Sequence, residues 1–263
     1  MKLRTINQPD ESGHEITMRI SLVIILLALL FITSFPAKAT VIVPEDTLCP
    51  VGGEAIQTYT VLSVYLDDDV DMDFKRYGPA MDLVTSYPEC PSNGFVVFKK
   101  EFTSIELERL SVYMRSQEFR SARNEVVNYR AFLLKKYLGG YSKAELGETL
   151  LRATWQANGF WQYRKYAQEA WNYFVEESER LRGQSTDDAF YAMHIRGELS
   201  RRLMKYWDAY LTFSFQISRP GIKESGYHDL ARHQRWATLL FWFGKLPAVE
   251  KDFLWAIEKR IFQ

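Results

Sequence analysis

Apolar residues recur at helical spacing through most of the chain after Ser104. Leu146, Leu150 and Ala153 fall at positions i, i+4 and i+7, and their run ends at the turn residues Asn158-Gly159. A second stripe follows this turn and consists of Tyr163, Tyr166, Ala170 and Tyr173. Residues three and four apart lie on one face of an α-helix, so each stripe predicts a helix with one buried side. Together they predict a helix, a glycine turn and a second helix.

The same arrangement recurs twice further along the chain, around turns at Met204 and Gly244. Each turn is followed by a small or β-branched residue five positions on and a phenylalanine nine positions on, namely Ala209 with Phe213 and Val249 with Phe253. This pattern resembles tetratricopeptide repeats, in which the small residue lets the second helix pack closely on the first. The two turns are 40 residues apart, where the repeat has about 34. The sequence therefore predicts an irregular tetratricopeptide-like bundle of about three helix pairs.

The region before this bundle has a different pattern. Residues 56–66 and 94–98 are rich in β-forming residues and are separated by proline and glycine, which predicts a small antiparallel sheet. Every tryptophan lies between Trp155 and Trp255, so the two regions have different compositions. We therefore expect a mainly α protein, with a β-ribbon-like subdomain over residues 40–102 and a tetratricopeptide-like helical domain over residues 103–263.

The first 39 residues are typical of a secretory signal peptide. Arg19 precedes an apolar run over residues 20–35, and Ala37-Lys38-Ala39 places small residues where signal peptidase reads them. We expect cleavage after Ala39, with translation starting at Met1 or Met18. The apolar run is shorter than the ~20 residues that span a bilayer, although an uncleaved membrane anchor remains the alternative. The sequence thus predicts that residues 40–263 are periplasmic or secreted.

The exported part is nearly neutral. Four basic and three acidic residues precede Thr40, which leaves 29 basic and 30 acidic residues in the remaining 224. Nucleic acids and anionic membranes are held by an excess of Lys and Arg, so this balance argues against both as partners. A protein or peptide of the cell envelope is the partner that we expect, with membrane contact only through an uncleaved signal anchor.

The two cysteines lie in similar settings. Cys49-Pro-Val-Gly-Gly and Cys90-Pro-Ser-Asn-Gly each look like half of a zinc knuckle, with Gly52 and Asn93 in place of the second cysteine. A structural zinc ion needs four N or S ligands, and residues 40–101 contain no histidine to replace the missing thiolates. This ligand count argues against zinc. Thiols that faced one metal ion would lie close enough to oxidise in an exported protein, so we expect a Cys49–Cys90 disulfide.

The two half-knuckles enclose the sequence Asp71-Met72-Asp73-Phe74. This arrangement resembles an uncharacterised bacterial family, domain of unknown function 2225, which joins a CPxCG…CPxCG zinc ribbon with an intervening D-x-D-F segment to tetratricopeptide-like helices. The resemblance implies an architecture, because the family has no established activity. The departures at Gly52 and Asn93 argue against the family's zinc ion in this chain.

The acidic run around the D-x-D-F segment has a second interpretation. Asp69, Asp71 and Asp73 have the spacing with which a calcium-binding EF-hand loop begins. However, Phe74 stands where that loop needs glycine, and Ala80 stands where it needs a bidentate glutamate. A solvated acidic turn is therefore favoured, with a weak calcium site as the alternative.

Catalytic motifs are scarce. The exported part has three histidines, and His228 and His233 are five residues apart, which places them on different helix faces. No zinc-protease, nucleophile-elbow, phosphate-loop or dinucleotide-binding motif occurs. Glu176, Glu177 and Glu198 could form a carboxylate pair only through tertiary contacts. We therefore expect an exported non-catalytic adaptor, with a periplasmic hydrolase or carbohydrate-active protein that has a carboxylate and aromatic cleft as the alternative.

Candidate partner-binding residues lie in the helical region. Trp161 and Trp242 stand beside turns, where an exposed aromatic residue would serve binding. Four basic residues could line one helix face for an acidic partner, or form a solvated face: Arg196, Arg201, Arg202 and Lys205. The other stripe aromatics are expected in the core: Trp155, Phe174, Tyr210, Phe213, Trp236 and Phe253.

Overall fold

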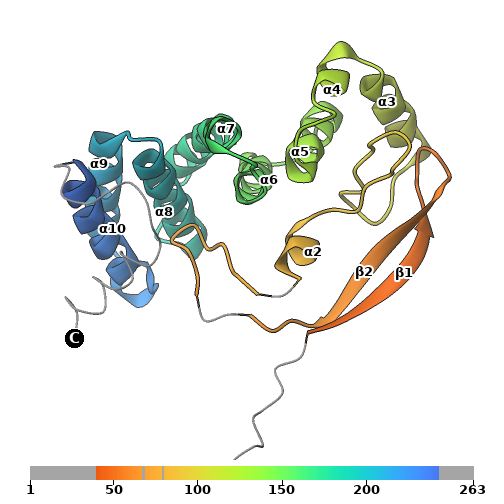
Figure 1. The fold of residues 1–263 in the computed structure, drawn as a ribbon. Coiled ribbons are helices and arrows are strands. Elements are labelled where there is room, and N and C mark those ends of the chain that lie inside the picture. Colours follow the sequence, from red (N-terminus) through yellow and green to blue (C-terminus); the bar gives the residue numbers. More distant parts are fainter. Residues whose placement is uncertain (1–39, 67–68, 79, 243–263) are drawn as a thin grey trace, which may run out of the picture. The chain divides into compact units, whose positions relative to one another are not determined.

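The computed structural model describes residues 40–66, 69–78 and 80–242, and Figure 1 shows their fold. Within these ranges the protein is mainly α-helical, with one small antiparallel hairpin at the N-terminal side, and this fold class agrees with the sequence prediction. The predicted strand over residues 94–98 is wrong, because that segment has only an isolated bridge between Glu89 and Val96. The expected signal peptide and the expected helix around Val249 and Phe253 lie outside the described residues. None of the helices in the described ranges is long and apolar enough to cross a membrane.

The hairpin pairs β1 (Val41–Leu48) with β2 (Ala55–Ser63), with Val43 opposite Thr60 and Leu48 opposite Ala55. Most positions of both strands are exposed, and Ile56 is the buried exception. A two-stranded hairpin is marginally stable alone in water, so its attachment to the rest of the chain matters. The Cys49 turn at its tip provides that attachment, as described below.

The helices follow in chain order. Their bounds are α2 Met81–Thr85, α3 Ser104–Met114, α4 Gln117–Ser121, α5 Val127–Leu138, α6 Lys143–Trp155, α7 Phe160–Arg180, α8 Asp187–Arg202, α9 Tyr206–Ile217, the 3₁₀ helix η1 Ile222–Glu224, and α10 Tyr227–Trp242. Capping boxes fix two of the starts, because Thr103 and Glu106 cap α3 and Ser142 and Glu145 cap α6. The helix breaks thus follow local sequence signals.

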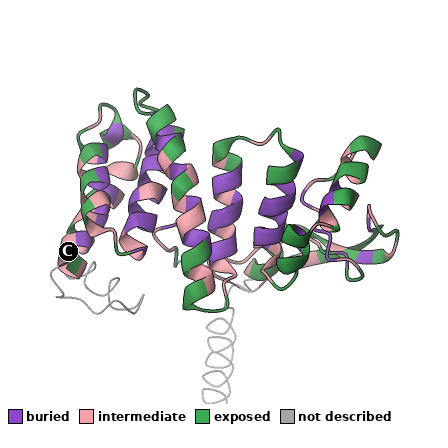
Figure 2. Cartoon of the chain, turned by 90° about the horizontal axis from the view of Figure 1, so that it is seen from above, coloured by how far each residue is buried: buried purple, intermediate pink, exposed green. Residues whose placement is uncertain are grey.

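Consecutive helices pack side by side from α5 to α10, and buried residues line the sides that face neighbouring helices (Figure 2). Ala209 and Phe213 on α9 are both fully buried. The Phe213 ring lies over Gly197 of α8, where an added Cβ would come within 2.7 Å of two ring carbons. A glycine is therefore required for this close approach between α8 and α9.

One cluster of buried residues runs from the hairpin turn into the helices. It joins Cys49, Cys90 and Phe95 to Leu150 on α6 and Leu199 on α8, among others. Composition predicts a domain boundary near residue 102, and the packing is continuous across that position. The N-terminal region and the helices therefore share apolar burial.

Burial corrects one core expectation. Phe174 and Phe213 are buried and Trp155 and Tyr210 are half-buried, but Trp236 is 55% exposed. The prediction that Trp236 lies in the core is wrong for the described residues. Its position is rotated by about 140° around α10 from the buried Ala231, so it does not share the side that packs on the preceding helices.

Candidate functional site

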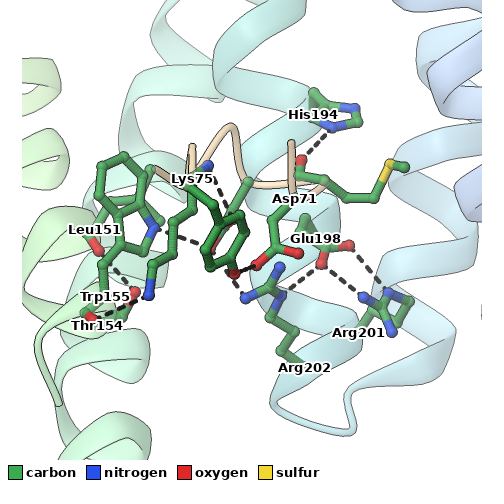
Figure 3. Close-up of polar contacts among 12 residues, drawn as sticks. Asp71, Lys75, Leu151, Thr154, Trp155, His194, Glu198, Arg201 and Arg202 are labelled. Atoms are coloured by element: carbon green, nitrogen blue, oxygen red, sulfur yellow. Dashed lines mark hydrogen bonds and ion pairs between the residues drawn. The ribbon is translucent and has the colours of Figure 1, made fainter. Parts of the chain in front are cut away.

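The D-x-D-F segment folds into a tight turn that lies against α6 and α8 (Figure 3). The Asp71 carbonyl accepts from the Phe74 amide at 2.8 Å, and the Asp71 amide donates to the Lys75 carbonyl at 2.9 Å. Phe74 has a positive φ of 63°, a conformation that bulky residues rarely adopt. The turn places the Asp73 carboxylate and the Phe74 ring against the helices.

Asp73 is fully buried and has partners from both helices. Its Oδ2 accepts from the indole Nε1 of Trp155 at 3.0 Å and pairs with the guanidinium of Arg202 at 3.0 Å. Its Oδ1 accepts from the Lys75 amide at 3.3 Å. A buried carboxylate is tolerated only with such partners, so Asp73 connects the turn to the C-terminal ends of α6 and α8.

Glu198 extends this polar cluster along α8. It is fully buried and accepts two bonds from Arg201, at 2.6 and 3.0 Å, and one from Arg202 at 2.5 Å. Burial by itself would raise the pKa of Glu198, but the two guanidinium groups outweigh it and hold that pKa well below its usual range. The two carboxylates of this cluster, Asp73 and Glu198, are thus matched by two guanidinium groups.

His194 and Phe74 form the more apolar end of the contact between the D-x-D-F turn and α8. The His194 Nε2 donates to the Met72 carbonyl at 2.8 Å, which fixes the neutral tautomer. The Phe74 ring lies 5.3 Å from the His194 ring, and the rings of Tyr191 and Tyr227 lie 5.6 and 6.1 Å from Phe74. Burial lowers the pKa of His194, which is fully buried.

The expected calcium ligands do not converge. Asp73 points into the helices, and the Asp71 carboxylate accepts from the Tyr77 hydroxyl at 2.6 Å. Asp69, Asp71 and Asp73 form no metal-type group of ligand atoms in the part of the chain that the structure describes.

The expected disulfide is present. Cys49 and Cys90 are bonded, with their Cα atoms 5.7 Å apart. The two cysteine turns share one hydrogen-bond pattern, in which each cysteine amide donates to the carbonyl five residues on, Glu54 in one turn and Phe95 in the other, at 2.8 Å. The Glu54 carboxylate accepts from the Ser92 hydroxyl and lies beside Gly52, where a Cβ would come within 1.9 Å of it.

The basic residues expected to line a partner face are largely used within the protein. Arg201 and Arg202 belong to the polar cluster, and Arg196 pairs with Glu179 and Asp208, each at 3.1 Å. The Lys205 ammonium instead lies 3.1 Å from the centroid of the Trp171 ring. Arg201 also lies over an aromatic ring, with its guanidinium 5.1 Å from the centroid of the Phe241 ring.

The two tryptophans that we expect to contact a partner, Trp161 and Trp242, are exposed. Trp161 is 78% exposed and its ring lies 5.1 Å from Phe160, which is 58% exposed. Trp242 is 43% exposed and lies 5.6 Å from the Trp207 ring. These two groups of aromatic side chains are at different places on the helical region: one at the start of α7, the other where the start of α9 meets the end of α10.

Sequence reasoning missed His194 and the ion pair between Asp73 and Arg202. The pair Glu198 and Arg202 has the i, i+4 spacing of a helical ion pair, so that half of the cluster could be found by pattern. It also missed Arg130, which donates from two nitrogens to Glu89 at 2.6 and 2.7 Å and holds the Cys90 region against α5. The Asp73–Arg202 and Glu89–Arg130 pairs and the contact of His194 with Met72 all join segments that are far apart in the chain.

Comparisons place the chain in a family. Residues 42–238, well over half of the sequence, match the bacterial family described as "Uncharacterized protein conserved in bacteria (DUF2225)". No curated protein and no solved structure matches the chain. The matched range contains the cysteine turns, the D-x-D-F turn and nearly all of the described helices, so this chain belongs to the DUF2225 family.

Proposed function

We propose that this protein is an exported, non-catalytic adaptor that binds a protein or peptide of the cell envelope through its helical surface. One observation carries the proposal, the exposed aromatic pair Phe160 and Trp161 at the start of α7. Exposed tryptophan is costly in water and is enriched at the centres of protein interfaces. A paired arrangement at a helix start gives a partner a ready apolar contact.

Basic side chains close to this pair indicate the partner's chemistry. The Arg164 guanidinium lies 6.0 Å from the Phe160 ring. Lys205 lies over Trp171 and interacts electrostatically with Arg164, and burial lowers the pKa of Lys205. A cation near the exposed Phe160 ring and a second over the half-buried Trp171 favour a partner segment that carries both carboxylates and apolar side chains.

The architecture supports a binding role. Successive antiparallel helices with a glycine under Phe213 are consistent with tetratricopeptide-like pairs, which commonly present extended binding faces. The two matching cysteine turns are consistent with a degenerate zinc ribbon in which the Cys49–Cys90 disulfide replaces the metal. The ribbon then serves as a cap that the D-x-D-F turn fixes to the helices.

Export is the second part of the proposal. The predicted signal peptide lies outside the described residues, so the disulfide provides the supporting observation. Disulfides persist in oxidising compartments and are rare in a reducing cytoplasm. A periplasmic or secreted location is consistent with the predicted signal peptide and with the disulfide.

The alternative of a hydrolase needs two convergent carboxylates that are free to exchange protons. The glutamates that could have formed such a pair are each engaged by a cation: Glu177 by Arg180, Glu198 by Arg201 and Arg202, and Glu176 by Lys143. None of these contacts favours the hydrolase, and the adaptor remains the proposal.

Capture from the native envelope tests the adaptor. The tagged full chain would be crosslinked in its host, purified, and compared with Trp161→Ser and with the control Trp236→Ser, which removes an exposed tryptophan from another helix. We expect one near-stoichiometric partner that is lost only with Trp161→Ser, and whose purified form binds that variant about tenfold more weakly. Equal capture by all three chains would contradict the proposal.

A further inference from the structure

The two edges of the β1–β2 hairpin differ in their capacity to pair with a further strand. The middle of β1 contains Pro44, Glu45 and Asp46. Proline has no backbone N–H to donate, and carboxylates on an edge strand discourage pairing with another chain. By contrast, residues 55–63, which form β2, contain no proline and no charged side chain. The hairpin is therefore protected along β1 and unprotected along β2.

The backbone of β2 offers hydrogen-bonding groups along its outer edge. Within the described residues β2 pairs with β1 alone, and Pro44 lies opposite Tyr59. The Thr58 hydroxyl donates to the Glu45 carbonyl at 3.1 Å, so that carbonyl points toward β2. Because the pairs of an antiparallel ladder alternate, the backbone groups of residues 57, 59 and 61 then point away from β1. A proline opposite Tyr59 fits this assignment, since that pair needs no N–H from residue 44.

The side chains along this edge are neutral and largely exposed. Tyr59 is 42% exposed, Leu62 is 67% exposed, and Thr60 between them is exposed as well. Ile56, near the tip of the hairpin, belongs to the buried cluster that continues into the helices. A two-stranded hairpin is marginally stable by itself in water, and further strands stabilise it. An added strand would satisfy the outward backbone groups of β2 and cover part of these side chains.

A second copy of β2 is the strand that fits this edge. Antiparallel pairing about a two-fold axis at Tyr59 places Tyr59 opposite its copy and Gln57 opposite Val61. All pairs between two copies of residues 55–63 are uncharged, so no like charges oppose each other, whereas a charged peptide would gain no ion pair here. Strand β1 would form both outer edges of the four-stranded sheet. Its proline and carboxylates would stop growth at two copies.

We propose that the outer edge of β2 pairs antiparallel with β2 of a second copy, which gives a closed dimer with a four-stranded sheet in the order β1–β2–β2–β1. The dimer uses the hairpin, whereas the proposed adaptor function uses Phe160 and Trp161 on α7, so the two proposals are independent. Dimerisation would present two copies of the α7 surface to a partner.

Capture between two differently tagged full chains, coexpressed in the host, tests the pairing. We expect unaltered chains to retain each other. Tyr59→Lys in both chains should reduce capture at least about tenfold, because two ammonium groups would then lie opposite each other. Tyr59→Glu in both chains should have the same effect, and Tyr59→Lys in one chain with Tyr59→Glu in the other should restore capture. Asp46→Lys, on the protected edge of β1, is the matched control and should preserve it.

Hydrogen exchange gives a second measurement on the purified chains. The amides of Gln57 and Val61 should exchange at least about tenfold more slowly in the unaltered dimer than in the Tyr59→Lys protein. The amides of Thr58 and Thr60, which point toward β1, should be equally protected in both proteins and show that the hairpin is intact.

Three results would overturn the proposal. One is the absence of capture between unaltered chains. Another is capture that persists when both chains carry Tyr59→Lys, or that the mixed pair of variants does not restore, since the copies would then not meet at this strand. The third is slow exchange of Gln57 and Val61 in monomeric protein, which would assign the edge of β2 to another segment of the same chain.

Discussion

The Asp73 carboxylate and the Arg202 guanidinium form an ion pair at 3.0 Å that joins the segment between the two cysteines to the last turn of α8. Burial would lower the pKa of Arg202, but Asp73 and Glu198 outweigh it and hold that pKa well above its usual value. Arg202 therefore stays charged at every pH at which the protein folds. The pair connects the cysteine-containing region to the helices.

Removing one member of this pair should destabilise the whole fold. Asp73→Ala leaves Arg202 with one carboxylate partner, Glu198, and leaves the Trp155 indole N–H without its acceptor. We expect a loss of about 2–4 kcal/mol in the free energy of unfolding, measured by urea denaturation. Asp69→Ala is the control, because Asp69 is exposed on the same acidic run, and it should change stability by less than about 0.5 kcal/mol. Equal effects of both substitutions would contradict the structural role of Asp73.

The disulfide should contribute strongly to stability. Replacing both Cys49 and Cys90 by serine opens a loop with a sequence separation of 41 residues. The chain-entropy model gives a loss of about 4 kcal/mol in the free energy of unfolding. A reducing agent should shift the unfolding midpoint of the unaltered chain and leave that of the double variant unchanged. Finding both thiols open to alkylation in protein isolated without reductant would refute the crosslink.

Local patterns in the sequence predict the helices well because helical burial repeats at short range. Ala209 and Phe213 are buried on α9 as their spacing indicates, and the glycine turn ahead of α7 lies where the sequence places it. The same reasoning fails for Trp236, because a stripe shows that a helix side is apolar and does not show what covers it.

The candidate site depends on contacts that no local pattern contains. The sequence singles out Asp73 for a metal, while its partners Trp155 and Arg202 belong to helices that follow much later in the chain. Likewise, the run of basic residues on α8 suggests an acidic partner, but Arg201 and Arg202 meet carboxylates of the protein itself. Charge patterns reveal which groups need a partner, and only the fold shows which partner they find.

The free energy of unfolding should decrease as the pH is lowered below about 6.5, because of His194. Burial lowers its pKa below the ordinary value of 6.5, with the Met72 carbonyl, Glu198 and Asp73 offsetting part of the effect. Below pH 6.5 the unfolded chain binds a proton at His194 that the folded chain disfavours, so the free energy of unfolding decreases as the pH is lowered. His194→Gln should flatten this slope between about pH 7 and pH 5.5.

The close contact between α8 and α9 gives a matched pair of glycine substitutions. At Gly197 an added methyl group would lie 2.7 Å from two carbons of the buried Phe213 ring, whereas at Gly183 it would meet nothing within 4 Å. We expect Gly197→Ala to cost about 1–3 kcal/mol of stability and Gly183→Ala to be neutral within about 0.5 kcal/mol. Thermal unfolding measures both.

Shortening the Phe213 side chain should show whether Gly197→Ala acts by overpacking against that ring or by an effect on the α8 backbone. Phe213→Leu alone creates a cavity and destabilises the protein, but in the Gly197→Ala background it also relieves the clash with the new methyl group. The double variant should therefore be more stable than the sum of the two single effects implies, by about 0.5–3 kcal/mol. Strict additivity would mean that the Phe213 ring does not press on Gly197, and the packing of α9 on α8 would then differ from the one described.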